Sequence, residues 1–147
     1  MPVNLGPSTH AFLRIVAGVL FLQHGLQKLF GAFGGVNGSG GTVQLDSLLG
    51  VAGALEFCGG ILLIAGLLTR PVAAVLFAEM VAAYFMAHVP KGGWPIQNQG
   101  ELALLYAGIF VFLAGNGAGP LSVDALVPIS QSRDRRHRPD RRIQAAA

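Results

Sequence analysis

The chain has 147 residues, of which 52% are hydrophobic and only 12% are charged, and its mean hydropathy is +0.57. Soluble domains carry about 25% charged residues, so this composition argues against an ordinary soluble domain and indicates one small integral membrane unit. The net charge of +3 does not favour nucleic-acid binding, because six arginines sit together in residues 133–142. A basic segment after a hydrophobic helix is a cytoplasmic topology signal.

Four apolar segments follow one another along the chain, and each predicts a membrane-spanning helix. They cover about residues 11–30, 48–68, 71–88 and 100–116. A helix needs about 20 residues to cross a hydrocarbon core ~30 Å thick, and the fourth segment reaches that length only with its polar flanks. We therefore predict an all-α, integral membrane four-helix bundle over residues 1–127, followed by a flexible basic cytoplasmic tail at 128–147.

The distribution of lysine and arginine predicts the orientation of this bundle. In a four-span chain, Arg70 and the arginine-rich tail lie on one side of the membrane, and Lys28 and Lys91 lie on the other. The side with more basic residues is normally cytoplasmic. We therefore predict a multi-pass protein of the cell membrane with both termini in the cytoplasm.

Polar residues recur on one face of the first predicted helix, where Arg14, His24 and Lys28 share a stripe. Ionisable residues within a span normally face the protein interior. With a rise of ~1.5 Å per residue, His24 and Glu56 lie within about 5 Å of the same depth. We predict a polar pocket, open toward the outer side, in which Glu56 is the partner of His24. Its members are His24, Lys28, Glu56 and Glu101.

Two of these pocket residues also have a simpler interpretation. Lys28 extends to the outer headgroups if it snorkels, and Glu101 caps the fourth helix if its carboxylate meets the positive end of the helix dipole.

A second polar pair is predicted in the inner half of the bundle. Arg14 on the first helix and Glu79 on the third overlap in depth, so we predict that they form a structural ion pair. A purely structural role for Glu56 and Glu79 stays open, because interhelical polar contacts also hold membrane bundles together.

The chain contains one cysteine, Cys58. A single cysteine cannot form an intramolecular disulfide, a CxxC redox pair or a thiolate metal cluster. We expect Cys58 to be a small buried apolar residue, and we predict no metal site.

Three segments resemble the DoxX family of small four-helix membrane proteins. They are "RIVAGVLFLQHGLQKLFG" (14–31), "GALEFCGGILLIAGLLTRPVA" (53–73) and "GPLSVD" (119–124), and the similarity extends over nearly all of residues 12–126. The resemblance implies a four-helix bundle. It also marks the family-patterned polar positions, which are Arg14, His24, Lys28, Glu56, Arg70 and Asp124.

The family takes its name from a subunit of a thiosulfate:quinone oxidoreductase, so the resemblance implies an accessory or quinone-interacting subunit of a membrane oxidoreductase system. No haem, flavin or iron–sulfur motif is recognisable in the sequence, so electron transfer would require a quinone or a partner that holds the redox centre. Two alternatives stay open: a non-catalytic structural or partner-binding subunit, and a small-solute carrier. The sequence leaves enzymatic activity and oligomeric state open, and the lipid bilayer is the one partner that composition itself predicts.

Overall fold

The computed structural model describes residues 6–126, and every regular element within this range is helical. The all-α prediction is therefore confirmed for the described residues, whereas the predicted tail at 128–147 lies outside them. A π-helical turn (Tyr84–His88) and short 3-10 turns (Ala32–Gly34, Val89–Lys91) join the α-helices. The α-helices are α1 (Gly6–Phe30), α2 (Leu48–Ala65), α3 (Thr69–Ala83), α4 (Pro95–Asn98), α5 (Glu101–Asn116) and α6 (Val123–Leu126).

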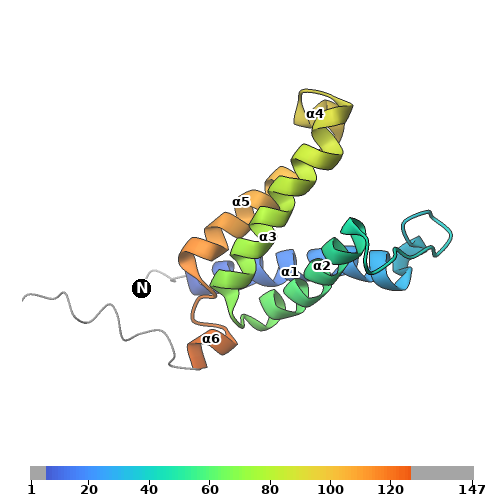
Figure 1. Cartoon of the computed structure of the whole chain (residues 1–147). Helices are drawn as coiled ribbons and strands as arrows, with labels where there is room; N and C mark the ends of the chain where they lie inside the picture. The colour runs from blue at the N-terminus through green and yellow to red at the C-terminus, as the bar shows by residue number, and fades with distance from the viewer. Residues whose placement is uncertain (1–5, 127–147) are drawn as a thin grey trace, which may run out of the picture.

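The four long helices pack as two antiparallel pairs (Figure 1). α1 lies along α2, and α3 lies along α5, and these two pairs carry most of the contacts between helices. The pairs meet at the end where α6 lies, and they diverge toward the end that carries α4 and the loop before α2. A compact four-helix bundle and the cytoplasmic placement of both termini stay predictions.

Two described helical segments are long and apolar enough to cross a membrane: Leu48–Ala65, which is α2, and Thr69–Lys91, which begins with α3. α5 is apolar but has only 16 residues. α1 has 25 residues and is long enough, but its polar positions make it less apolar than these two segments. Length and composition thus support two spans directly, and spans at α1 and α5 stay predictions.

The turn between α2 and α3 lies earlier than the break between the predicted segments 48–68 and 71–88. α2 ends at Ala65 because Gly66 adopts a left-handed conformation with φ +67°, a common way to terminate a helix. α3 then begins at Thr69, so Pro71 falls in its first turn. A proline is tolerated there because the first N–H groups of a helix have no intrahelical acceptor.

Glycines allow α1 and α2 to approach each other closely. A Cβ atom at Gly25 would lie 2.5 Å from the backbone nitrogen of Phe57, and a Cβ at Gly60 would lie 2.9 Å from the carbonyl oxygen of Gly18. Such distances leave no room for any side chain, so the two backbones are in direct contact. This contact places the polar stripe of α1 within reach of side chains on α2.

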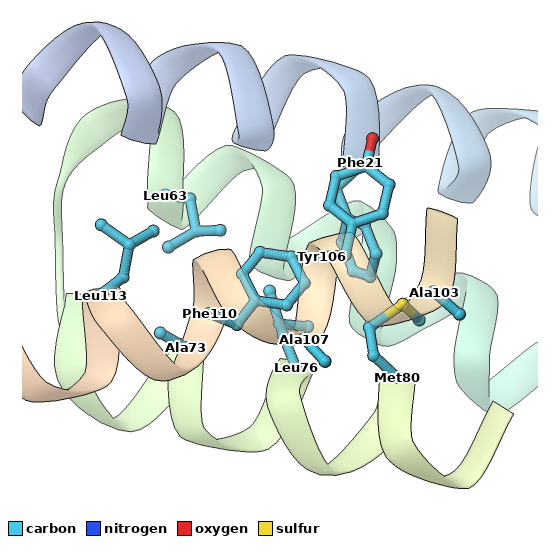
Figure 2. Packing of buried hydrophobic residues seen from close by; sticks show 10 residues of the cluster. All are labelled: Phe21, Leu63, Ala73, Leu76, Met80, Ala103, Tyr106, Ala107, Phe110 and Leu113. Carbon is cyan, nitrogen blue, oxygen red and sulfur yellow. The ribbon is translucent and has the colours of Figure 1, made fainter. Parts of the chain in front are cut away.

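The hydrophobic core lies where the two pairs cross (Figure 2). α5 contributes residues at three- and four-residue spacing, which places them on one face of the helix. Leu76 and Met80 of α3 pack against this face, and Phe21 of α1 closes it with ring centroids 4.8 Å from Phe110 and 5.2 Å from Tyr106. The residues of α5 in the core are Ala103, Tyr106, Ala107, Phe110 and Leu113.

Candidate functional site

A salt bridge between Lys28 of α1 and Glu56 of α2 forms the centre of the candidate site. The ammonium Nζ of Lys28 donates to Oε1 of Glu56, and the side chains are 20% and 4% exposed. A Cβ atom at Gly53 would lie 3.0 Å from the Cβ of Lys28. The stem of the lysine therefore crosses α2 at Gly53, and its ammonium group reaches the carboxylate one helical turn further on.

The prediction that His24 is the partner of Glu56 is wrong, because Lys28 holds that position. Depth along the helix allowed either residue, but the close approach at Gly53 favours the longer side chain. The snorkelling alternative for Lys28 is also contradicted, since its ammonium group is bonded to α2.

His24 lies beside the salt bridge and faces aromatic rings. Its ring centroid is 6.5 Å from that of Phe21 and 6.3 Å from that of Tyr106, with edge-on geometry in both pairs. The imidazole also interacts electrostatically with Lys28. His24 thus connects the polar residues of α1 and α2 to the buried aromatic residues of α5.

Glu79 of α3 lies near the same salt bridge. Both of its carboxyl oxygens are buried, and neither has a hydrogen-bond partner. Its carboxyl group interacts electrostatically with Glu56 and Lys28. Together, residues from all four long helices meet here, and we call this set the polar cluster: His24, Lys28, Glu56, Glu79 and Tyr106.

The predicted ion pair between Arg14 and Glu79 is wrong. The guanidinium group of Arg14 is buried and donates only to backbone carbonyl oxygens at the other end of the helix pairs. Nη1 bonds the carbonyls of Leu63 and Ile64, Nη2 bonds that of Leu121 at 2.7 Å, and Nε bonds that of Ala118 at 3.2 Å. The last carbonyls of a helix lack intrahelical donors, so the end of α2 offers acceptors that reasoning from charge and depth overlooked.

Asp124 completes the contacts around the α2–α3 turn. Its carboxylate accepts hydrogen bonds from the backbone N–H groups of Leu68 (2.8 Å) and Thr69 (2.9 Å), and so caps the start of α3. Arg70 donates to the carbonyl of Gly115, and the ring of His10 bonds the carbonyl of Gly117. The resemblance to the DoxX family marks Arg14, Arg70 and Asp124 as polar positions, and their contacts here hold helix ends together.

Glu101 does not join the polar cluster. It is exposed at the first residue of α5, where it lines a shallow surface depression with apolar and amide side chains. That depression includes none of the other predicted pocket residues; its lining is Ile96, Gln99, Glu101, Leu102 and Leu105. The divergence of the two helix pairs carries this end of α5 away from α1 (Figure 1).

Tyr106 is the member of the polar cluster that the sequence interpretation missed. It is buried on α5, it stacks on Phe110 with centroids 5.7 Å apart, and it interacts electrostatically with Glu56. Its hydroxyl group points toward α1 (Figure 2). The available signal was a lone phenol in an otherwise apolar helix, since a buried tyrosine hydroxyl normally seeks a polar partner.

Within residues 6–126, no three His, Cys, Asp or Glu side chains are arranged to hold a metal ion. Cys58 is exposed on α2, so the expectation that it is buried is wrong. The α1–α2 contact occupies other positions of α2, which include Gly53 and Gly60.

Comparison with known proteins agrees with this architecture. An uncharacterized protein of Haemophilus influenzae is 45% identical over 117 residues, which cover 78% of this chain and 87% of the relative. A Bacillus subtilis protein named "Putative oxidoreductase CatD" is 29% identical over 116 residues, 78% of this chain and 84% of its own. No solved structure matches the chain. The DoxX family model matches residues 10–89, and the chain therefore belongs to the DoxX family, whose typical architecture is a four-helix membrane protein.

Proposed function

We propose that this protein is a quinone-interacting accessory subunit of a membrane oxidoreductase system, located in the cell membrane. The observation that carries the proposal is the polar cluster, in which hydrogen-bonding groups from four helices, partly or fully buried, lie against buried aromatic rings. A quinone head group is a flat ring with two carbonyl oxygens. A fitting site therefore needs aromatic contacts for the ring and donors for the oxygens.

The residues of the cluster match these needs. Lys28 and His24 carry N–H donors, and Tyr106 carries a hydroxyl group that points toward α1 (Figure 2). Phe21, Tyr106 and Phe110 form a buried aromatic group whose ring centroids lie 4.8–5.7 Å from one another. One oxygen of Glu56 is buried without a partner, so this carboxylate can accept a further hydrogen bond in addition to its salt bridge with Lys28.

A bound quinone would accept two electrons and two protons to become a hydroquinone. The electrons would come from the redox centre of a partner protein, and the role of this chain would be to bind and orient the ring. The relative named as an oxidoreductase supports an oxidoreductase system by its name alone. The proposed quinone reduction is therefore an activity of the complex with that partner, and the part played by this chain is binding of the quinone.

Quinone binding by the purified protein tests the proposal. We expect a short-chain ubiquinone to bind the wild-type protein in detergent and to raise its melting temperature. Tyr106→Phe removes only the hydroxyl group and should weaken binding about fivefold, equivalent to a neutral hydrogen bond of ~1 kcal/mol. Tyr84→Phe is the matched control, because Tyr84 lies in the π-helical turn after α3 and contacts Phe85 and His88. Absence of saturable binding, or equal effects of both changes, would contradict the quinone site.

A second candidate, a non-catalytic partner-binding subunit, is favoured by one feature of the cluster. Lys28 and Glu56 bond each other directly, as expected of a pair that fixes the α1–α2 geometry. Purification from native membranes in mild detergent, with mass spectrometry of co-purifying proteins and lipids, separates the two. A stoichiometric partner without quinone would support the second candidate.

A further inference from the structure

We propose that Glu79 and Glu56 form a proton-binding site, in which Glu79 holds one exchangeable proton at neutral pH. This inference goes beyond the quinone role and does not depend on it. It starts from an imbalance in the polar cluster: two buried carboxyl groups share a single cation, Lys28.

The surroundings of Glu79 leave its charge without compensation. Both carboxyl oxygens are buried and unpartnered. The charged groups with which it interacts are Glu56 on α2 and Lys28 on α1, and the ammonium group of Lys28 is bonded to Glu56. α5 contributes the phenol of Tyr106, which interacts with Glu56, and α1 also contributes His24 beside Lys28.

The other lysine and arginine side chains of the described residues form bonds elsewhere or are exposed. Arg14 and Arg70 donate to backbone carbonyls around the α2–α3 turn, and Lys91 is exposed after the π-helical turn. Within residues 6–126, therefore, no further lysine or arginine contacts the carboxyl group of Glu79.

A proton on Glu79 removes its uncompensated charge and also gives its carboxyl group a hydrogen-bond donor. Ionised, Glu79 would be a second buried negative charge beside Glu56, which burial and like-charge repulsion both disfavour. Protonated, it is neutral, and its O–H becomes a donor. Oε2 of Glu56 is a buried acceptor without a partner in the same cluster. One ammonium, one carboxylate and one carboxylic acid then give the cluster no net charge.

Infrared spectroscopy of the purified full-length protein, without added quinone, tests the site directly. At neutral pH we expect the C=O stretch of a protonated carboxylic acid, shifted on transfer to D₂O. Glu79→Gln should abolish this band, while Glu101→Gln should leave it intact because Glu101 is exposed. Glu56→Gln should also abolish it, since Lys28 is then free to neutralise an ionised Glu79.

Several results would overturn the proposal: no band in the wild type, a band that survives Glu79→Gln, or a band that survives Glu56→Gln. Loss of the band on adding sodium or potassium, with a stabilisation absent in Glu79→Gln, would show an alkali-cation site instead. Thermal melting of the wild type gives a readout that needs no variant. The unfolded chain releases this proton above about pH 4.3, whereas the folded state holds it, so stability should fall as pH rises from about 5 to the pH at which the folded Glu79 ionises. A flat or rising profile contradicts the site.

Discussion

The guanidinium group of Arg14 occupies the space that a side chain at Gly66 would need. A Cβ atom at Gly66 would lie 2.7 Å from Nη1 of Arg14 and 2.5 Å from the Cβ of Ser122. The glycine that ends α2 thus also leaves room for the arginine that bonds the last carbonyls of the same helix. Helix termination and the junction between the two helix pairs depend on the same few atoms.

Gly66→Ala should therefore destabilise the protein. Alanine in a left-handed conformation costs about 1–2 kcal/mol, and displacement of Arg14 adds to this cost, so we expect a loss of roughly 2 kcal/mol or more. Gly108→Ala is the control, because a Cβ at Gly108 meets nothing within 4 Å and alanine is favoured in a helix. Denaturation curves in detergent measure both, and equal stabilities of the two variants would contradict this account.

Arg14 and Glu79 should behave as independent residues. Arg14→Met leaves several buried carbonyl oxygens without a donor, and each should lower the free energy of unfolding by about 1 kcal/mol or more. Glu79→Gln should have a small effect because Gln replaces a neutral acid. The double variant should lose the sum of the two within about 0.5 kcal/mol. A double variant that is markedly more stable than this sum would restore the ion pair that the structure lacks.

Lys28 and Glu56, in contrast, should be strongly coupled. Lys28→Met leaves a buried carboxylate without its cation, which costs about 3–5 kcal/mol when the pair is well buried. Adding Glu56→Gln removes the stranded charge and should recover a large part of the loss. A double-mutant cycle on unfolding free energies measures the coupling, and additive losses would show that the bond contributes little.

The topology is testable with engineered cysteines in a Cys58→Ala background. We expect a cysteine at Ser39, which is exposed in the loop before α2, to react with an impermeant thiol reagent in intact cells. A cysteine at Ser132, in the basic segment, should react only after the membrane is permeabilised, because basic segments stay in the cytoplasm. The reverse pattern would invert the orientation and place the polar cluster nearer the cytoplasmic side.

Much of the fold could be predicted from the sequence because the signals are local. Apolar segments of helical length locate α2, α3 and α5, and the stripe through Arg14, His24 and Lys28 identifies the polar face of α1. Such patterns depend on residues three and four positions apart on the same helix. The sequence therefore determined the helical elements, the family and most members of the polar cluster.

The pairing of those residues was decided only by the tertiary structure. Which side chain meets Glu56 depends on where α1 crosses α2, and the close approaches at Gly25 and Gly53 set that crossing. Arg14 bonds carbonyl oxygens at the end of α2, which are available because that helix terminates there. Divergence of the helix pairs separates Glu101 from the cluster, whereas their crossing places Tyr106 beside Phe21 and His24 of α1. Depth along a helix is a one-dimensional coordinate, whereas contact requires the rotation and spacing of two helices that only packing fixes.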